Sequence, residues 1–188
     1  MEVAERAVEL DPVNQVSQGA LGLTLLLRGD RERGRAAADR AIELNPNSAL
    51  WLGLLGSWVS ARGDFDRGVP WAQRALELDP NPPPWVRMPM FLDHYHNRRY
   101  EAALSEAQNI ETEDYRTPVF LVAAYAQLGR LDEAKRVLAE MTTRWPLPAD
   151  RIRRDMIQRN GYEPELVDHL MDGLRKAGFD SEPQELSG

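Results

Sequence analysis

A six-residue pattern recurs along this chain at a fixed interval, and no other feature constrains the fold as strongly. The pattern reads AVELDP at residues 7–12, AIELNP at 41–46 and ALELDP at 75–80. The closing prolines are therefore 34 residues apart each time. A fixed period of roughly 20 to 50 residues is typical of stacked repeats, in which each unit buries its apolar face against its neighbours.

Each period contains two segments with helical spacing of apolar residues. After Pro46, large apolar side chains recur every three or four positions through residues 50–58, which predicts a helix. The sequence RGD follows at 62–64, and its glycine can adopt the left-handed conformation with which many helices end. A second helix is predicted over 65–78, and it ends before Pro80 because proline disfavours the helical conformation of the preceding residue. The period thus predicts a helix, a tight turn, a helix and a proline stop.

Small residues stand where the two helices of a period would cross, which would let their backbones approach closely. Together with the 34-residue period, this resembles the tetratricopeptide repeat (TPR) family. The resemblance implies an all-α fold, namely a right-handed α-solenoid of TPR helix-turn-helix repeats with a C-terminal helical cap. The repeat-packing positions that it assigns are Gly22, Gly34, Ala38, Ala41, Gly56, Gly68, Ala72, Ala75 and, less regularly, Ala103, Ala107, Tyr125 and Ala134.

The predicted repeats divide the chain into seven segments. Residues 1–12 would be a partial repeat with a second helix only, 13–46 and 47–80 two regular repeats, 81–113 a divergent repeat without the closing proline, and 114–146 a fourth repeat. Residues 147–178 hold two helical segments, at about 149–159 and 163–177, that do not fit the period. We interpret them as capping helices, because a repeat array needs a terminal unit with a polar outer face. Residues 179–188 are predicted to be a disordered tail.

Several longer sequence segments resemble one particular set of TPR-containing proteins. They are PW at 84–85, PMFLDHY at 89–95, YEAAL at 100–104, AAYAQLGR at 123–130, and PELVDHL at 164–170 followed by GLRKAG at 173–178. Together they are similar to the C-terminal TPR region of bacterial signalling proteins. In those proteins a class III adenylate/guanylate cyclase or a winged-helix domain comes first, and a TolB-like segment often follows. The resemblance implies a regulatory module without catalytic residues of its own, so we expect no enzymatic activity of this chain.

Composition excludes several classes of partner. The net charge is −7, whereas binding of nucleic-acid phosphates requires a basic surface. No apolar run approaches the roughly 20 residues that span a bilayer, and no signal peptide is visible at the N-terminus. The absence of cysteine excludes disulfides and zinc–thiolate sites. We therefore expect neither a nucleic-acid nor a membrane partner, and a cytoplasmic location.

The three histidines do not predict a metal site. His94 and His96 are two residues apart, so on a helix they would point about 200° apart and would not share an ion. His169 lies beside Asp168 and is expected on a solvated helix face. There is no glycine-rich phosphate loop and no paired carboxylates in an apolar setting. We expect no metal and no cofactor.

One helical segment is unusually basic, with Arg151, Arg153, Arg154 and Arg159. With the helix after Asn160-Gly161 it could mimic a helix-turn-helix. The interpretation that we favour is a solvated cap whose arginines pair with acidic neighbours such as Asp155, Glu163 and Glu165.

The TPR resemblance also implies a binding groove, because the first helices of the repeats line the concave surface. The family's Lys and Asn clamp for terminal carboxylates is missing from these positions, so an amphipathic helix is the expected ligand. The alternative left open is that these residues form core between repeats or are covered by the chain's own parts. The groove positions are Val16, Gly19, Leu23, Leu26, Leu50, Gly53, Ser57, Ser60, Trp85, Met88, Leu92, Tyr95, Arg116, Val119, Ala123 and Gln127.

Three functional hypotheses follow. The first is a protein-interaction arm of a signalling effector, which contacts a protein or peptide, its own missing N-terminal domain, or a second copy through the truncated edge at Val3, Ala7 and Leu10. The second is a stand-alone adaptor that binds a peptide or helix in the groove. The third is a small-ligand sensor with a pocket near Trp85, Met88, Tyr95 and His96. The tryptophans at 51, 58, 71 and 145 are expected to pack between helices.

Overall fold

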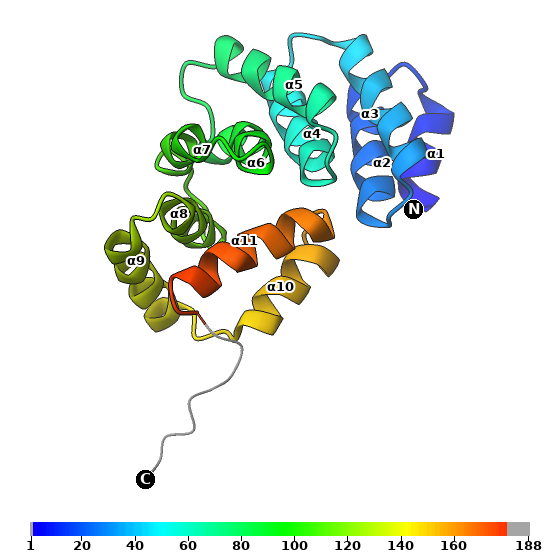
Figure 1. The fold of residues 1–188 in the computed structure, drawn as a ribbon. Helices are drawn as coiled ribbons and strands as arrows, with labels where there is room; N and C mark the ends of the chain where they lie inside the picture. Colours follow the sequence, from blue (N-terminus) through cyan, green and yellow to red (C-terminus); the bar gives the residue numbers. More distant parts are fainter. Residues whose placement is uncertain (1, 180–188) are drawn as a thin grey trace. The chain divides into compact units, whose positions relative to one another are not determined.

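The computed structural model describes residues 2–179, and this part of the chain contains eleven α-helices, one short 3-10 helix and no β-strand (Figure 1). The all-α prediction is therefore confirmed. The chain divides into two compact units, Met1–Pro89 and Met90–Gly188. No helix among the described residues is long and apolar enough to cross a membrane. The predicted disordered tail begins at Phe179, which is described, but its remaining residues, 180–188, lie outside the described part.

The first unit consists of consecutive helices that pair along the chain. Helix α2 packs against α3, and α4 packs against α5, while α1 contacts α2, and η1 contacts both α4 and α5. The bounds are α1 Glu2–Leu10, α2 Gln15–Leu27, α3 Arg31–Leu44, α4 Ala49–Ala61, α5 Phe65–Leu78 and η1 Pro84–Arg87.

The helix pairs are joined by the same left-handed turn. Gly29, Gly63 and Gly129 have φ angles of 83°, 81° and 74°, which glycine adopts without steric cost. In each turn the next N–H reaches back to a carbonyl of the preceding helix, as from Asp30 to Leu25 at 3.0 Å. The divergent repeat makes this turn with Arg98, at φ 57°, and the Arg99 N–H donates to the His94 carbonyl at 2.8 Å. The divergent repeat therefore keeps the left-handed turn although an arginine replaces the glycine.

Glycines let the paired helices cross at close range. A Cβ added to Gly22 would lie 3.0 Å from the Ala38 backbone nitrogen, and one added to Gly56 would lie 2.8 Å from the Gly68 carbonyl oxygen. A Cβ on Gly68 would overlap the Ser60 hydroxyl. The other assigned packing positions also lie inside: Gly34 against Leu26, Tyr125 at 8% exposure, and Ala38, Ala41, Ala72, Ala75, Ala103, Ala107 and Ala134 at 0–1%.

The second unit is organised around α8. Helices α7, α9 and α11 all pack against α8, and α10 packs against α11. Phe120 of α8 stacks on Phe91 of α6 with ring centroids 4.3 Å apart, and it meets the ring of Tyr162 edge-on at 6.4 Å. The bounds are α6 Met88–His96, α7 Tyr100–Ala107, α8 Arg116–Gln127, α9 Leu131–Arg144, α10 Ala149–Gln158 and α11 Pro164–Lys176.

The first helix of the divergent repeat is broken into two parts. The structure has η1 followed directly by α6, and α6 ends at His96. Pro89 lies in the first turn of α6. Because proline has no N–H, the first turn of a helix is the position that tolerates it best. Pro89 therefore fits the start of α6, but proline alone does not account for the break after η1, since Pro70 lies inside the continuous helix α5.

Candidate protein-interaction surfaces

Most residues of the predicted groove are buried. Val16 and Leu50 are the clearly exposed members, at 60% and 61%. Leu23, Trp85, Arg116 and Gln127 are half-buried. The buried members are Gly19, Leu26, Gly53, Ser57, Ser60, Met88, Leu92, Tyr95, Val119 and Ala123.

In the first unit, tryptophans of the following repeat pack on the groove glycines. A Cβ on Gly19 would meet the Trp51 ring, with its Cε3 atom 2.5 Å away. A Cβ on Gly53 would lie 3.0 Å from Val86 and 3.6 Å from the ring of Trp85. Gly19 and Gly53 are one 34-residue period apart, and so are Trp51 and Trp85. These positions therefore form a repeated contact between neighbouring repeats.

Arg62 was not singled out in the sequence beyond its place in a turn, yet it is 5% exposed. Its guanidinium donates to the carbonyl of Leu26 at 2.7 and 3.1 Å and lies 5.1 Å from the centre of the Trp58 ring. It thereby adds to the hydrogen bond that the Leu26 carbonyl accepts from the Gly29 N–H at 3.1 Å, at the C-terminal end of α2. Arg28, one period earlier, is exposed, so the repeat pattern could not have identified this role.

In the second unit, the chain's own helix α11 covers the inner face of α8. Val119 and Ala123 of α8 are 0% exposed, and a Cβ on Gly173 of α11 would lie only 2.7 Å from the Ala123 Cα. The apolar side of α11, including Leu170 and Leu174, is buried as well. At Ala123, therefore, another segment of the same chain covers a position that was expected to line the groove.

Polar contacts accompany this apolar packing of α11. Tyr95 donates to the carbonyl of His169 at 3.1 Å, and the Tyr100 hydroxyl lies 3.0 Å from His169 Nε2. Gln127 bridges two side chains of α11, donating to Asp172 at 3.1 Å and accepting from Lys176 at 2.7 Å. His169, expected on a solvated helix face, is therefore half-buried, with its ring against the rings of Tyr95 and Tyr100.

Burial at this contact shifts the pKa values of two side chains, His169 and Tyr95. Burial lowers the pKa of His169, and the positive charges of Arg98 and Lys176 act in the same direction, while Asp172 opposes them. Burial also raises the pKa of the Tyr95 phenol. Both shifts favour the neutral forms of the side chains that hold α11 in place.

We expect the stability of the protein to decline in mild acid through His169. Its folded-state pKa is lowered below the ordinary value of 6.5, so the unfolded chain takes up a proton first. The stability contributed by neutral His169 is therefore complete above about pH 6.5 and falls as the pH drops below it, with a slope of at most about 1.4 kcal/mol per pH unit. Urea denaturation at several pH values between 5 and 8, with His169→Gln as the reference, measures this contribution. An identical pH dependence in both proteins would contradict it.

Helix α1 has an apolar face that the described residues leave open. Val3 and Leu10 are 84% and 71% exposed. Ala7 is half-exposed, whereas its counterpart one period later, Ala41, is 0% exposed because α2 packs against α3 there. In Figure 1, α1 lies beside α2 at one end of the first unit. The surface of α1 formed by Val3, Ala7 and Leu10 is called the α1 face below.

The arginines of α10 are paired with acidic residues, as the favoured interpretation expects. Arg151 pairs with Asp155 at 2.8 Å, whereas Arg153 pairs with Asp168 at 2.6 Å and not with the nearer glutamates in the sequence. Arg154 lies 3.8 Å from Asp150. Such exposed pairs contribute little to stability, since water screens both partners.

The remaining predictions concern the small-ligand pocket and the tryptophans. Met88 and Tyr95, proposed to line a ligand pocket, are 6% and 0% exposed. Trp51 and Trp71 pack against a cluster formed by Ala38, Ala41 and Leu55, as expected. Trp58 lies under Arg62, and Trp145 is half-buried at the rim of a surface pocket that is described below. Among residues 2–179, no group of three His, Asp or Glu side chains could hold a metal ion.

Comparison with known proteins identifies the fold. No protein-family model and no curated protein matches the chain. Among solved structures, the chain is similar to YrrB, described as a TPR protein with an unusual peptide-binding site, with a TM-score of 0.63 and 19% identity over 97% of this chain and 94% of that one. It also aligns with a chain of Naa15/Naa10 bound to HypK-THB, with a TM-score of 0.47 and 18% identity over 94% of this chain and 28% of that one. The chain therefore has the fold of a TPR protein, built from helix-turn-helix repeats.

Proposed function

We propose that this chain is a protein-interaction module that serves as the regulatory C-terminal arm of a bacterial signalling protein. The α1 face is the proposed contact with the effector part of that protein. The effector class, a cyclase or a winged-helix domain, rests on the phrases between residues 84 and 178 that resemble such proteins. The partner at the α1 face is an amphipathic helix of the effector.

The exposure of the α1 face is the observation that carries this proposal. Val3 and Leu10 lie on one face of the helix with the half-exposed Ala7 between them, so together they offer an apolar surface that another helix could cover. In α3, the equivalent face is buried by a preceding helix, α2, whose Gly22 allows close approach to Ala38. A helix with a small residue at the matching position would bury Val3, Ala7 and Leu10 in the same way.

The experiment starts from the reading frame upstream of the Met1 codon in the genome of origin. Where the frame continues into an effector domain, that upstream part is produced separately and its affinity for this chain is measured by isothermal titration calorimetry. We expect Leu10→Glu to weaken binding by about tenfold or more, because a carboxylate would be buried against an apolar helix.

Leu50→Glu is the matched control, since Leu50 is a leucine of similar exposure that lies outside the α1 face. It should leave the affinity for the effector part unchanged. A stop codon directly upstream, or binding that is indifferent to Leu10→Glu, would contradict the regulatory arm at the α1 face.

The second candidate function is an adaptor that binds a helix along the first helices of the repeats. Two exposed positions favour it, because Val16 and Leu50 lie one 34-residue period apart in α2 and α4 and both present apolar side chains to solvent. In that case Leu50→Glu, rather than Leu10→Glu, would weaken partner binding.

A further inference from the structure

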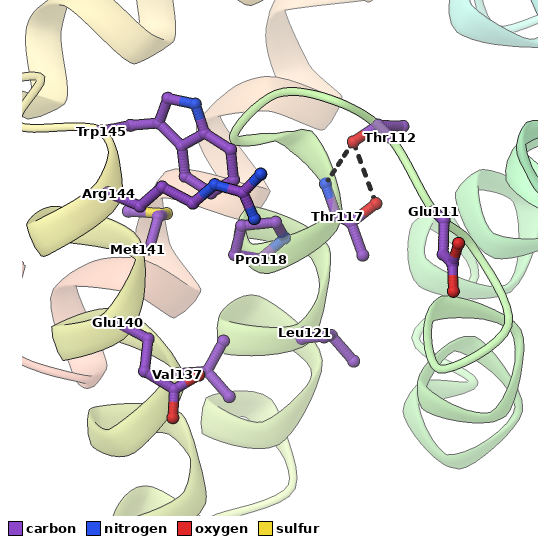
Figure 2. A pocket seen from close by; sticks show the side chains of 10 residues that line it. All are labelled: Glu111, Thr112, Thr117, Pro118, Leu121, Val137, Glu140, Met141, Arg144 and Trp145. Carbon is purple, nitrogen blue, oxygen red and sulfur yellow. Dashed lines mark hydrogen bonds between the residues drawn. The ribbon is translucent and has the colours of Figure 1, made fainter.

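The second unit contains a pocket away from the contact between α8 and α11. It has a volume of about 430 Å³ and lies between α8, α9 and the segment before α8 (Figure 2). Its apolar wall is formed by Pro118 and Leu121 of α8 and by Val137, Met141 and Trp145 on the α9 side. Of these, all except Met141 are half-buried, so they offer apolar surface to a ligand.

The walls of the pocket are held by contacts within the chain. Thr112, in the segment before α8, and Thr117, in the first turn of α8, share a hydrogen bond of 3.0 Å, and the Thr117 N–H donates to the Thr112 hydroxyl at 3.2 Å. Asp114 accepts two bonds from the Arg116 guanidinium, both 2.9 Å. The segment is therefore fixed at the start of α8 before any ligand binds, which reduces the entropy cost of binding.

The rim of the pocket carries an excess of negative charge. Glu111 lies on the segment before α8 and Glu140 on α9, so the two carboxylates line the pocket from different elements (Figure 2). Within residues 2–179, neither of these carboxylates has an ion-pair partner. The one cation at the rim, Arg144, is placed over the Trp145 ring with its guanidinium 4.5 Å from the ring centre.

We propose that this pocket binds a short peptide segment in which an aliphatic side chain or proline is flanked by lysine or arginine. The apolar residue would fill the space between Leu121, Val137 and Trp145, and the basic side chains would pair with Glu111 and Glu140. The charge of the rim disfavours an acidic peptide. The rim carries two carboxylates and one guanidinium, and that guanidinium is already stacked on an aromatic ring. This site is separate from the α1 face and does not depend on the regulatory role proposed above.

The test is selection from a random twelve-residue peptide library, displayed on phage, against the full chain at low ionic strength. We expect the enriched peptides to combine aliphatic residues or proline with lysine or arginine. Synthetic copies of them should bind about tenfold more weakly to the double variant Glu111→Gln/Glu140→Gln, and their affinity for the wild type should fall as salt is added.

The control removes the same number of charges elsewhere in the same unit. Glu101 and Glu165 are exposed carboxylates on α7 and α11 that do not line the pocket, so Glu101→Gln/Glu165→Gln should bind the peptides like the wild type. Leu121→Asp, checked for folding by circular dichroism, should abolish binding through the apolar wall. Failure to enrich any peptide, enrichment of acidic or uncharged peptides, or binding that is unchanged in both pocket variants would overturn the proposal.

Discussion

Gly68→Ala should destabilise the first unit by about 2–3 kcal/mol, although alanine is the better helix former by about 1 kcal/mol. The added methyl group would overlap the Ser60 hydroxyl and lie 2.5 Å from the carbonyl oxygen of Gly56. The backbone of α4 can yield only by moving away from α5, which separates the buried faces of the pair. Urea denaturation followed by tryptophan fluorescence measures this loss, because four of the five tryptophans lie in the first unit.

Two variants make this expectation specific. Gln73→Ala, at an exposed position of the same helix, should leave the stability unchanged or raise it slightly, which separates helix propensity from packing. Adding Ser60→Ala to Gly68→Ala should recover only part of the loss, since the contact with the Gly56 carbonyl remains. Full recovery in the double variant would show that the helix backbones are not in contact at this point.

Gly173→Val should detach α11 from α8, with a loss of about 3 kcal/mol or more from the second unit. A Cβ at Gly173 would lie 2.7 Å from the Cα of Ala123 and 3.0 Å from its carbonyl oxygen, and a branched side chain adds further overlap. Once α11 leaves, Leu170 and Val119 lose their cover and become exposed to water. Hydrogen–deuterium exchange should therefore accelerate in both α8 and α11.

Arg175→Val is the matched control, because it places the same side chain at an exposed position two residues further along α11. Its ion pair with Asp172 is 3.8 Å long and exposed, so little stability depends on it. Exchange in α8 should remain slow in this variant. Equal rates of hydrogen–deuterium exchange in α8 of Gly173→Val and Arg175→Val would mean that the contact between Gly173 and Ala123 does not hold α11 in place.

Much of the helical organisation could be predicted from the sequence, because it depends on local chemistry. The three hexads and their prolines mark helix ends by steric restriction of the preceding residue. The glycines at 29, 63 and 129 occur where the backbone must adopt a positive φ. The turn at Arg98 could not be predicted in this way, because a residue other than glycine rarely adopts a positive φ by its own preference.

The candidate surfaces could be predicted only in part. Helical spacing assigned Val16, Leu50, Leu92, Tyr95 and Ala123 alike to an open groove, whereas in the structure Val16 and Leu50 are exposed and the other three are buried. The sequence pattern of α11, with Leu166, Leu170 and Leu174 on one face, indicates that an apolar face must be covered. It carries no information on which helix covers that face.

The sequence by itself determined the repeat period, the helix pairs and their turns, because each depends on backbone preferences and spacing within about 34 residues. Only the tertiary structure decided that α11 occupies the face of α8, that Arg62 bonds to Leu26 across two repeats, and that Glu111 and Glu140 border one pocket. These are contacts between residues far apart in the chain, and they arise from the way in which complete helices fit together. No local preference encodes them, since an apolar or charged side chain has the same propensity whichever partner it meets.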